Sequence, residues 1–209
     1  MYKVKEIYYT LQGEGFHQGR AAVFCRFAGC NLWSGIEKDR ENAICKFCDT
    51  DFWGMDGENG GSYNKEDLYK KIKSLVPKQS DQHIFLVMTG GEPALQVDDE
   101  LVTYLKSNGV EIAIETNGTL PLPQRIDWIT VSPKANTKLI ITKGNELKLV
   151  FPQEENNPTQ FESFDFTHFY LQPLDNDHRL ENHDLCIQYI LSNPQWKLSI
   201  QSHKILGIR

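Results

Sequence analysis

Residues 30–50 read CNLWSGIEKDRENAICKFCDT, and the rest of the chain is organised around this stretch. It holds Cys30, Cys45 and Cys48 in the spacing C-x14-C-x2-C. Three thiols in one segment are more than packing requires. They are one fewer than the four ligands of a closed structural zinc site or of a fully cysteine-ligated iron–sulfur cluster. A metal centre held by these three cysteines would keep one coordination position open, and a ligand bound there could react.

The composition predicts a single domain, residues 1–209, with the cysteine loop covering about residues 28–62. Hydrophobic residues make up 40%, charged residues 24%, and the net charge is −6. No basic stripe is present, so we expect no nucleic-acid partner. No apolar run is long enough to span a bilayer and the N-terminus lacks a signal-peptide pattern, so we expect no membrane partner and a cytoplasmic location. The odd count of five cysteines argues against a disulfide framework.

Hydrophobic periodicity predicts short strands that alternate with helices. The expected strands are 2–10, 22–27, 84–88, 110–114, 126–131, 146–150, 168–171 and 196–200, and the expected helices are 65–76, about 98–107 and about 182–192. Such alternation favours parallel strands joined by right-handed crossovers. Connections such as 117–125 are too short or too rich in Pro and Gly for full helices. The predicted fold class is therefore α/β, an incomplete, modified (β/α) barrel with trimmed helices.

The strand 22–27 has two chemically different faces. One face carries Val23, Cys25 and Phe27, and the other carries Ala22, Phe24 and Arg26. Cys25 is therefore expected to be a packed core thiol and not a metal ligand. Arg26 is expected to bind an anion if its face lines an interior.

Polar motifs follow several predicted strands, where barrel folds place their active sites. They are the cysteine loop, TGGEP (89–93), Glu115, Ser132 with Lys134, Gln172 and His203. Near the N-terminus, LQGEGFHQGR (11–20) has three glycines between Gly13 and Gly19, which predicts a tight loop whose backbone can approach a ligand.

The three cysteines suit a 4Fe–4S cluster with one open iron, and zinc remains an alternative. Zinc would need a fourth ligand, for which His17 is the candidate, although the usual zinc spacings pair C-x2-C with a second close pair. A redox pair at Cys45 and Cys48 would leave Cys30 unexplained.

The cysteine loop after one barrel strand, followed by GGEP after the next, resembles the radical S-adenosylmethionine (SAM) enzymes, and Phe47 matches the aromatic residue before their last cysteine. The fourteen-residue first gap departs from their usual C-x3-C-x2-C. Within that superfamily the chain resembles the 7-carboxy-7-deazaguanine synthases with a long cluster loop. The motifs that carry this resemblance are YTLQGEG, CRFAGCNLWSG, FCDTDF, TGGEP, IETNG, VSPK and QSHK.

This resemblance implies a radical ring contraction of 6-carboxy-5,6,7,8-tetrahydropterin to 7-carboxy-7-deazaguanine, with loss of ammonia, on the route to queuosine and other 7-deazapurines. It implies a 4Fe–4S cluster, SAM and Mg²⁺ as cofactors. It also implies a homodimer and an external one-electron donor of the flavodoxin type. No protein acid or base is assigned a catalytic role, because a SAM-derived adenosyl radical abstracts the hydrogen atom.

The resemblance and the residue chemistry together predict the site. Arg26 suits a pterin carboxylate, Glu14 can accept from the pterin edge, and Thr50 can offer a hydroxyl to Mg²⁺. The predicted substrate residues are Leu11, Gln12, Gly13, Glu14, Arg26, Thr89, His203 and Arg209. The predicted SAM residues are Phe47, Asp49, Gly90, Gly91, Glu92, Glu115, Ser132, Pro133, Lys134, Gln172, Pro173, Leu174 and Asp175. The predicted metal ligands are Cys30, Cys45 and Cys48 for the cluster and Thr50 for Mg²⁺.

The segment QSHKILGIR (201–209) is expected to cross the mouth of the site, with Ile205, Leu206 and Ile208 as apolar anchors. The resemblance implies that the Arg209 carboxylate contacts the pterin. Two other functions stay open: a radical SAM activase of a glycyl-radical enzyme, and a non-catalytic zinc-binding interaction module.

Overall fold

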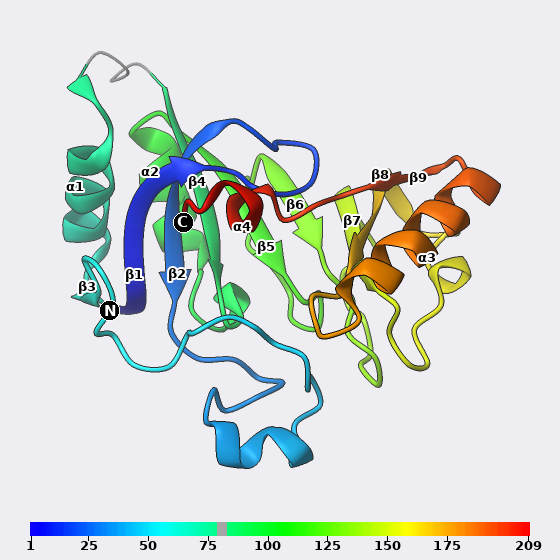
Figure 1. The fold of residues 1–209 in the computed structure, drawn as a ribbon. Coiled ribbons are helices and arrows are strands. Elements are labelled where there is room, and N and C mark those ends of the chain that lie inside the picture. The colour runs from blue at the N-terminus through cyan, green and yellow to red at the C-terminus, as the bar shows by residue number, and fades with distance from the viewer. Residues whose placement is uncertain (79–82) are drawn as a thin grey trace.

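The computed structural model describes residues 1–78 and 83–209, and its centre is one nine-stranded sheet in the order β3-β1-β2-β4-β5-β6-β7-β8-β9 (Figure 1). β1 is antiparallel to β2 and β3, and every other neighbouring pair is parallel. The sheet curves without closing, because β3 and β9 are its two edges.

The strands are β1 Tyr2–Leu11, β2 Ala21–Phe27, β3 Gly61–Tyr63, β4 Ile84–Gly90, β5 Val110–Thr116, β6 Trp128–Val131, β7 Lys143–Phe151, β8 Asp165–Pro173 and β9 Trp196–Leu198. The α-helices are α1 Lys65–Leu75, α2 Asp99–Ser107, α3 Arg179–Ser192 and α4 Ser202–Leu206, and the 3-10 helices are η1 Glu37–Asn42, η3 Pro93–Leu95 and η4 Pro158–Gln160.

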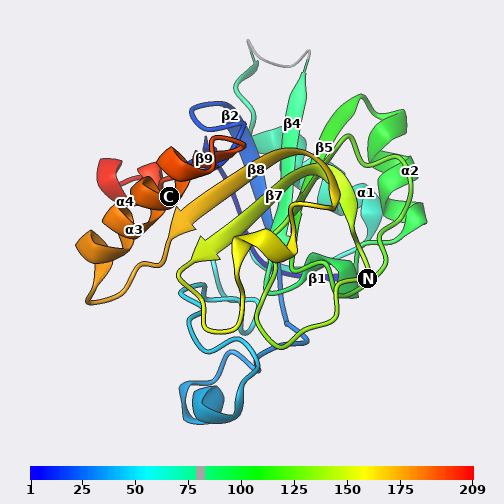
Figure 2. The same cartoon turned by 90° about the vertical axis from the view of Figure 1, so that its right-hand side faces the viewer.

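Helices cover the outer face of the sheet, where the apolar core lies. α1 and α2 pack against β1, β2, β4 and β5 in one buried cluster, and α3 packs against β7 and β8 in a second. The two groups of helices lie at opposite ends of the sheet, as both views show (Figures 1 and 2). The inner face of the sheet carries a small apolar cluster around Phe85 and Val87 and is otherwise left for polar side chains and for ligands.

Local sequence signals explain where α1 and α2 start. Asn64 caps α1 by accepting from the Asp67 N–H, and Asp98 caps α2 by accepting from the Leu101 N–H. The Asp98 carboxylate also accepts from the Tyr2 hydroxyl at 2.9 Å, which ties α2 to β1.

The predicted incomplete (β/α) barrel and all the predicted helices and strands are confirmed, with boundaries that shift by up to three residues. The predicted faces of β2 are also confirmed: Val23, Cys25 and Phe27 are fully buried in the core, while Phe24 and Arg26 face inward. The antiparallel direction of β1, the short strand β3 and the helix α4 were not predicted. Among the residues described here, no helix has the length and apolar character needed to cross a bilayer.

Two segments occupy the open inner side of the sheet. Because β1 is antiparallel, Leu11 pairs with Ala21 at the amino end of β2, so the loop 12–20 enters from the edge opposite the cysteine loop. After β9, the last residues cross in front of the sheet through α4 and end beside β1 (red in Figure 1). These two segments cover the gap that an incomplete barrel leaves.

Candidate functional site

A cavity of about 470 Å³ lies on the inner face of the sheet and gathers nearly all of the predicted site residues. Its wall combines the carboxyl ends of the parallel strands, the cysteine loop, the loop after β1 and the C-terminal segment. All predicted substrate residues and metal ligands line it, as do all predicted SAM residues except Glu92 and Pro133.

The cysteine loop folds back on itself, so that its distant cysteines face the same cavity. The N–H groups of Ile44 and Cys45 both donate to the Leu32 carbonyl, at 3.1 and 3.3 Å. Arg40 donates to the carbonyls of Lys46 and Cys48, at 2.9 and 3.1 Å, and its guanidinium lies 4.0 Å from the centre of the Trp33 ring. These contacts close the fourteen-residue excursion between Cys30 and Cys45.

The three thiols fit an iron–sulfur cluster: Cys45 is buried, and Cys30 and Cys48 are half-buried. Burial raises the pKa of Cys30, Cys45 and Cys48, so bound cations are needed to hold them as thiolates. The Leu32 N–H approaches the Cys30 sulfur at 3.4 Å, a contact that favours the thiolate. Within 1–78 and 83–209, no three His, Cys, Asp or Glu side chains converge on a point that would hold a single ion. In a 4Fe–4S cluster each cysteine ligand binds a separate iron, so its ligands need not meet at one point.

The zinc alternative loses its fourth ligand. The ring of His17 packs against Phe85 and Trp128, with centroids 4.9 and 4.4 Å away, and it does not line the cavity. Cys25 and Cys186 are fully buried, each in a different apolar cluster. Burial raises the pKa of both thiols, so they remain protonated packing residues.

Glu92 and Pro133 are the two predicted SAM residues that lie off the cavity. The Glu92 carboxylate is fully buried and accepts from the Ala94 N–H, the Thr116 hydroxyl and the Asn117 N–H, at 2.9, 2.7 and 2.7 Å. It braces the end of β4 against the end of β5. The side chains of Ser132 and Lys134 do face the cavity, where the Lys134 ammonium donates to the Ser132 carbonyl and hydroxyl, both at 2.7 Å.

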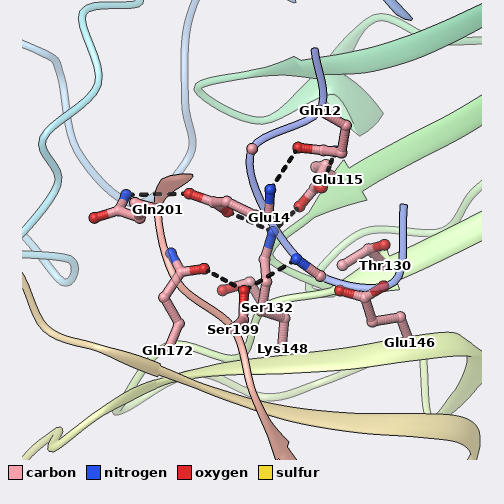
Figure 3. Close-up of polar contacts among 12 residues, drawn as sticks. Gln12, Glu14, Glu115, Thr130, Ser132, Glu146, Lys148, Gln172, Ser199 and Gln201 are labelled. Atoms are coloured by element: carbon pink, nitrogen blue, oxygen red, sulfur yellow. Dashed lines mark hydrogen bonds and ion pairs between the residues drawn. The ribbon is translucent and has the colours of Figure 1, made fainter. Parts of the chain in front are cut away.

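The floor of the cavity is a buried polar network (Figure 3). Lys148, on β7, donates to one oxygen of Glu14 at 2.6 Å and to one oxygen of Glu115 at 2.8 Å. The second oxygen of Glu14 accepts from Gln201 at 3.1 Å, and that of Glu115 accepts from Gln12 at 3.2 Å. Burial by itself would raise the pKa of Glu14, but the Lys148 ammonium holds it well below its usual range. Glu14 is therefore ionised and keeps free lone pairs for a ligand.

Opposite this floor, a wall on β1 and β2 combines a cation with an aromatic surface. Arg26 donates from Nε to Glu6 at 2.9 Å and from one terminal nitrogen to the Tyr8 hydroxyl at 3.3 Å. The remaining guanidinium N–H groups are left for an anion. The Tyr8 and Phe24 rings stack in parallel, with centroids 5.6 Å apart.

The C-terminal segment closes the open side of the cavity through polar contacts. Ser202 donates from its N–H and its hydroxyl to the Gly13 carbonyl, at 3.0 and 2.9 Å. Lys204 pairs with Asp49 at 2.6 Å and with Asp175 at 2.7 Å. Arg209 pairs with Glu6 and Glu58, and its main-chain oxygen accepts from the Thr10 hydroxyl.

The expectation that apolar residues anchor this segment was wrong. The side chains of Ile205, Leu206 and Ile208 are 70%, 63% and 38% exposed. α4 is a short helix whose polar residues face the cavity, so its apolar residues point outward. The close approach of this helix explains Gly13, where a Cβ would collide with the His203 ring.

Several residues that line the cavity were missed in the sequence. The most informative are Glu6, Tyr8, Lys148, Gln201 and Lys204. Strand parity offered one signal: Lys148 alternates with Leu147 and Leu149, so its side chain points to the opposite face of the sheet from theirs. No local signal marked Glu6 as the partner of Arg26, because the pairing depends on the register of β1 against β2.

Comparisons with known proteins agree with this geometry. A family model described as the radical SAM superfamily matches residues 40–136. The 7-carboxy-7-deazaguanine synthases of Caulobacter vibrioides and Burkholderia multivorans are 54% and 55% identical over 208 residues, covering 99% of this chain and 99% of each relative. The crystal structure of QueE from Escherichia coli superposes with a TM-score of 0.74 at 27% identity, covering 96% of this chain and 93% of that one. With half of its residues shared over nearly its whole length, the chain belongs to the 7-carboxy-7-deazaguanine synthase family of radical SAM enzymes.

Proposed function

We propose that this chain converts 6-carboxy-5,6,7,8-tetrahydropterin to 7-carboxy-7-deazaguanine, with loss of ammonia, as a step toward queuosine or other 7-deazapurines. The observation that carries the proposal is the 54% identity, over 99% of both chains, to a relative that bears the name of this activity. The cavity supports it, because the three cysteines and the polar side chains of Glu14 and Arg26 line the same volume.

Cys30, Cys45 and Cys48 would hold the 4Fe–4S cluster, and the cavity walls beside them would hold SAM. When bound, the reduced cluster and SAM supply radical chemistry at the substrate carbon. The chain's own residues bind and orient the two ligands. The residues Gly90, Gly91, Glu115, Ser132, Lys134 and 172–175 line the cavity, and in this proposal they form its SAM side.

The proposed substrate-binding half of the cavity is assigned by matching its side chains to the chemical groups of the pterin. The ionised Glu14 can accept N–H groups of the aminopyrimidinone edge. The free guanidinium N–H groups of Arg26 can pair with the pterin carboxylate. The Tyr8 and Phe24 rings offer an apolar surface beside that cation. Thr50 lines the same cavity and would give Mg²⁺ one hydroxyl ligand, with the substrate and waters completing the shell.

An activase of a glycyl-radical enzyme would need to admit a polypeptide to the same centre. The ion pairs of Lys204 and Arg209 instead fasten the C-terminal segment across the cavity, which favours a small substrate. A zinc-binding module is disfavoured because His17 lies away from the cysteines.

The decisive experiment is an anaerobic assay with a chemical reductant, SAM and 6-carboxy-5,6,7,8-tetrahydropterin, read by mass spectrometry. The expected products are 7-carboxy-7-deazaguanine and ammonia, which together account for every atom of the substrate, so 5′-deoxyadenosine should form only from SAM cleavage that is not coupled to product. Cys45→Ala should abolish them, while the matched variant Cys186→Ala should retain them. SAM cleavage without any deazapurine would refute the proposed substrate.

We also propose a homodimer, an external one-electron donor of the flavodoxin type and a cytoplasmic location. α3 supports a dimer, since Leu180 and Leu191 are 71% and 80% exposed on one helix. Replacing both with Lys should give a monomer by light scattering, and an unchanged mass would exclude this face.

The proposed cytoplasmic location is supported by the five unpaired cysteines, which suit a reducing compartment.

A further inference from the structure

Lys148 is a buried lysine in the middle of β7 that neither motif nor spacing marked. Its neighbours Leu147 and Leu149 face the outer core, so Lys148 faces the cavity, where it is 3% exposed. A lysine is almost never this buried unless it is paired. Its partners are Glu14 at 2.6 Å and Glu115 at 2.8 Å.

These two carboxylates belong to different halves of the site. Glu14 lies in the loop that follows β1, on the proposed substrate side, and Glu115 lies near the end of β5, on the proposed SAM side. Figure 3 shows the ammonium between them. Among the residues described, neither carboxylate forms an ion pair with any other cation. Lys148 is thus the charged link between the two binding surfaces.

The charges around Lys148 show what its removal would do. A third carboxyl, Glu146, lies on the same face of β7, and His203 lies near Glu14. Two further titratable groups lie near this cluster: the Lys148 charge acts on Lys134, and the Glu146 charge acts on Tyr170. Without the Lys148 ammonium, Glu14 and Glu115 would share a buried site with no adjacent cation. Like charges at low dielectric favour the uptake of a proton.

We propose that Lys148 is a positioning residue that keeps Glu14 ionised and holds Glu14 and Glu115 at a fixed separation, so that the substrate is held in register with SAM. The proposal rests on the proposed function, because it assigns the two sides of the site to those ligands. Glu14 acts directly by accepting N–H groups from the pterin edge, and Lys148 acts through Glu14. Loss of Lys148 would weaken substrate binding and would also let SAM be cleaved without product.

The test compares Lys148→Met, Lys148→Arg and the control Lys143→Met, which changes an exposed lysine on the same strand. Each anaerobic holoenzyme is assayed for iron content, for equilibrium binding of 6-carboxy-5,6,7,8-tetrahydropterin without reductant, for KM and kcat, and for 5′-deoxyadenosine formed per product.

Lys148→Met should weaken pterin binding about 10- to 100-fold, the loss expected when a charged acceptor is neutralised, and should raise the ratio of 5′-deoxyadenosine to product. The KM of this variant for the pterin should fall as pH rises, because Glu14 then ionises without help from Lys148. The KM of the wild type should not change in this way. Lys148→Arg should restore binding in part, and Lys143→Met should match the wild type. A lower kcat with unchanged pterin binding and an unchanged product ratio would overturn the proposal.

If Lys148→Met fails to fold, the double variant Glu14→Gln with Lys148→Met provides a second test. It removes one charge of each sign from the buried network. Its pterin binding should match that of Glu14→Gln alone, because Lys148 acts through Glu14. A further loss in the double variant would overturn the proposal. Wild-type enzyme that makes no deazapurine refutes the proposed function and this role together. Wild-type turnover with unaltered Lys148 variants refutes this role alone.

Discussion

Replacing Glu146 with Gln should change how the stability of this protein depends on pH. Glu146 is 2% exposed beneath the cavity floor, and one of its oxygens accepts from the Phe16 N–H at 3.1 Å. Burial raises its pKa, and the Lys148 ammonium offsets only part of this effect while the charges of Glu115 and Glu14 add to it. The result is a pKa of about 7, against an ordinary value of 4.5. A glutamine keeps the acceptor for Phe16 and has no charge at any pH.

The sign and size of the effect follow from proton linkage. Between pH 4.5 and 7 the folded state holds a proton that the unfolded state has lost, so the stability of the wild type falls as pH rises through this window. Each pH unit within the window costs about 1.4 kcal/mol. From pH 5 to 8.5, the stability difference between Glu146→Gln and the wild type should grow by roughly 2.5 kcal/mol in favour of the variant. For a chain of this size that corresponds to roughly 5–10 °C in Tm.

The assay is thermal unfolding of both proteins, followed by circular dichroism under anaerobic conditions at half-unit steps from pH 5 to 8.5. Subtracting the stability of the wild type from that of the variant at each pH cancels the contributions of the other titrating groups. Equal iron content in the two samples is the control. A difference that stays constant across this range would show that Glu146 titrates normally, and the account of its burial would fail.

Three further predictions concern the ligands. Arg26→Lys should raise KM for the carboxytetrahydropterin about 10- to 100-fold, since an ammonium cannot form the two-point pair while keeping the contact to Glu6; an unchanged KM would remove Arg26 from substrate binding. Thr50→Ala, or chelation of Mg²⁺, should lower turnover yet leave reductive SAM cleavage without substrate nearly intact, and equal loss of both activities would contradict that division. Cys25→Ala should keep its iron and Cys30→Ala should lose it, as measured on reconstituted protein, and the reverse result would overturn the ligand assignment.

The sequence alone predicted those features that depend only on residues close together in the chain. Ligand spacing depends on neighbouring residues, so Cys45 and Cys48 were recognisable as a pair, and strand alternation placed Cys25 in the core and Arg26 on the inner face. The carboxyl ends of parallel strands meet at one edge of a sheet, so the order of motifs predicted that they would converge. The cavity confirms that convergence.

The partners of those residues depended on contacts between distant segments. The pairing of Glu6 with Arg26 needs the antiparallel register of β1, and the link from Lys148 to Glu14 joins residues 134 positions apart. The alternation of polar and apolar residues on β7 could also have been misinterpreted, because polar residues on a strand usually face solvent. Here the outer face of the sheet is covered by helices, and the inner face lines a polar cavity. Lys148 therefore points inward while Leu147 and Leu149 point outward, and only the three-dimensional arrangement of helices and sheet decides that inversion.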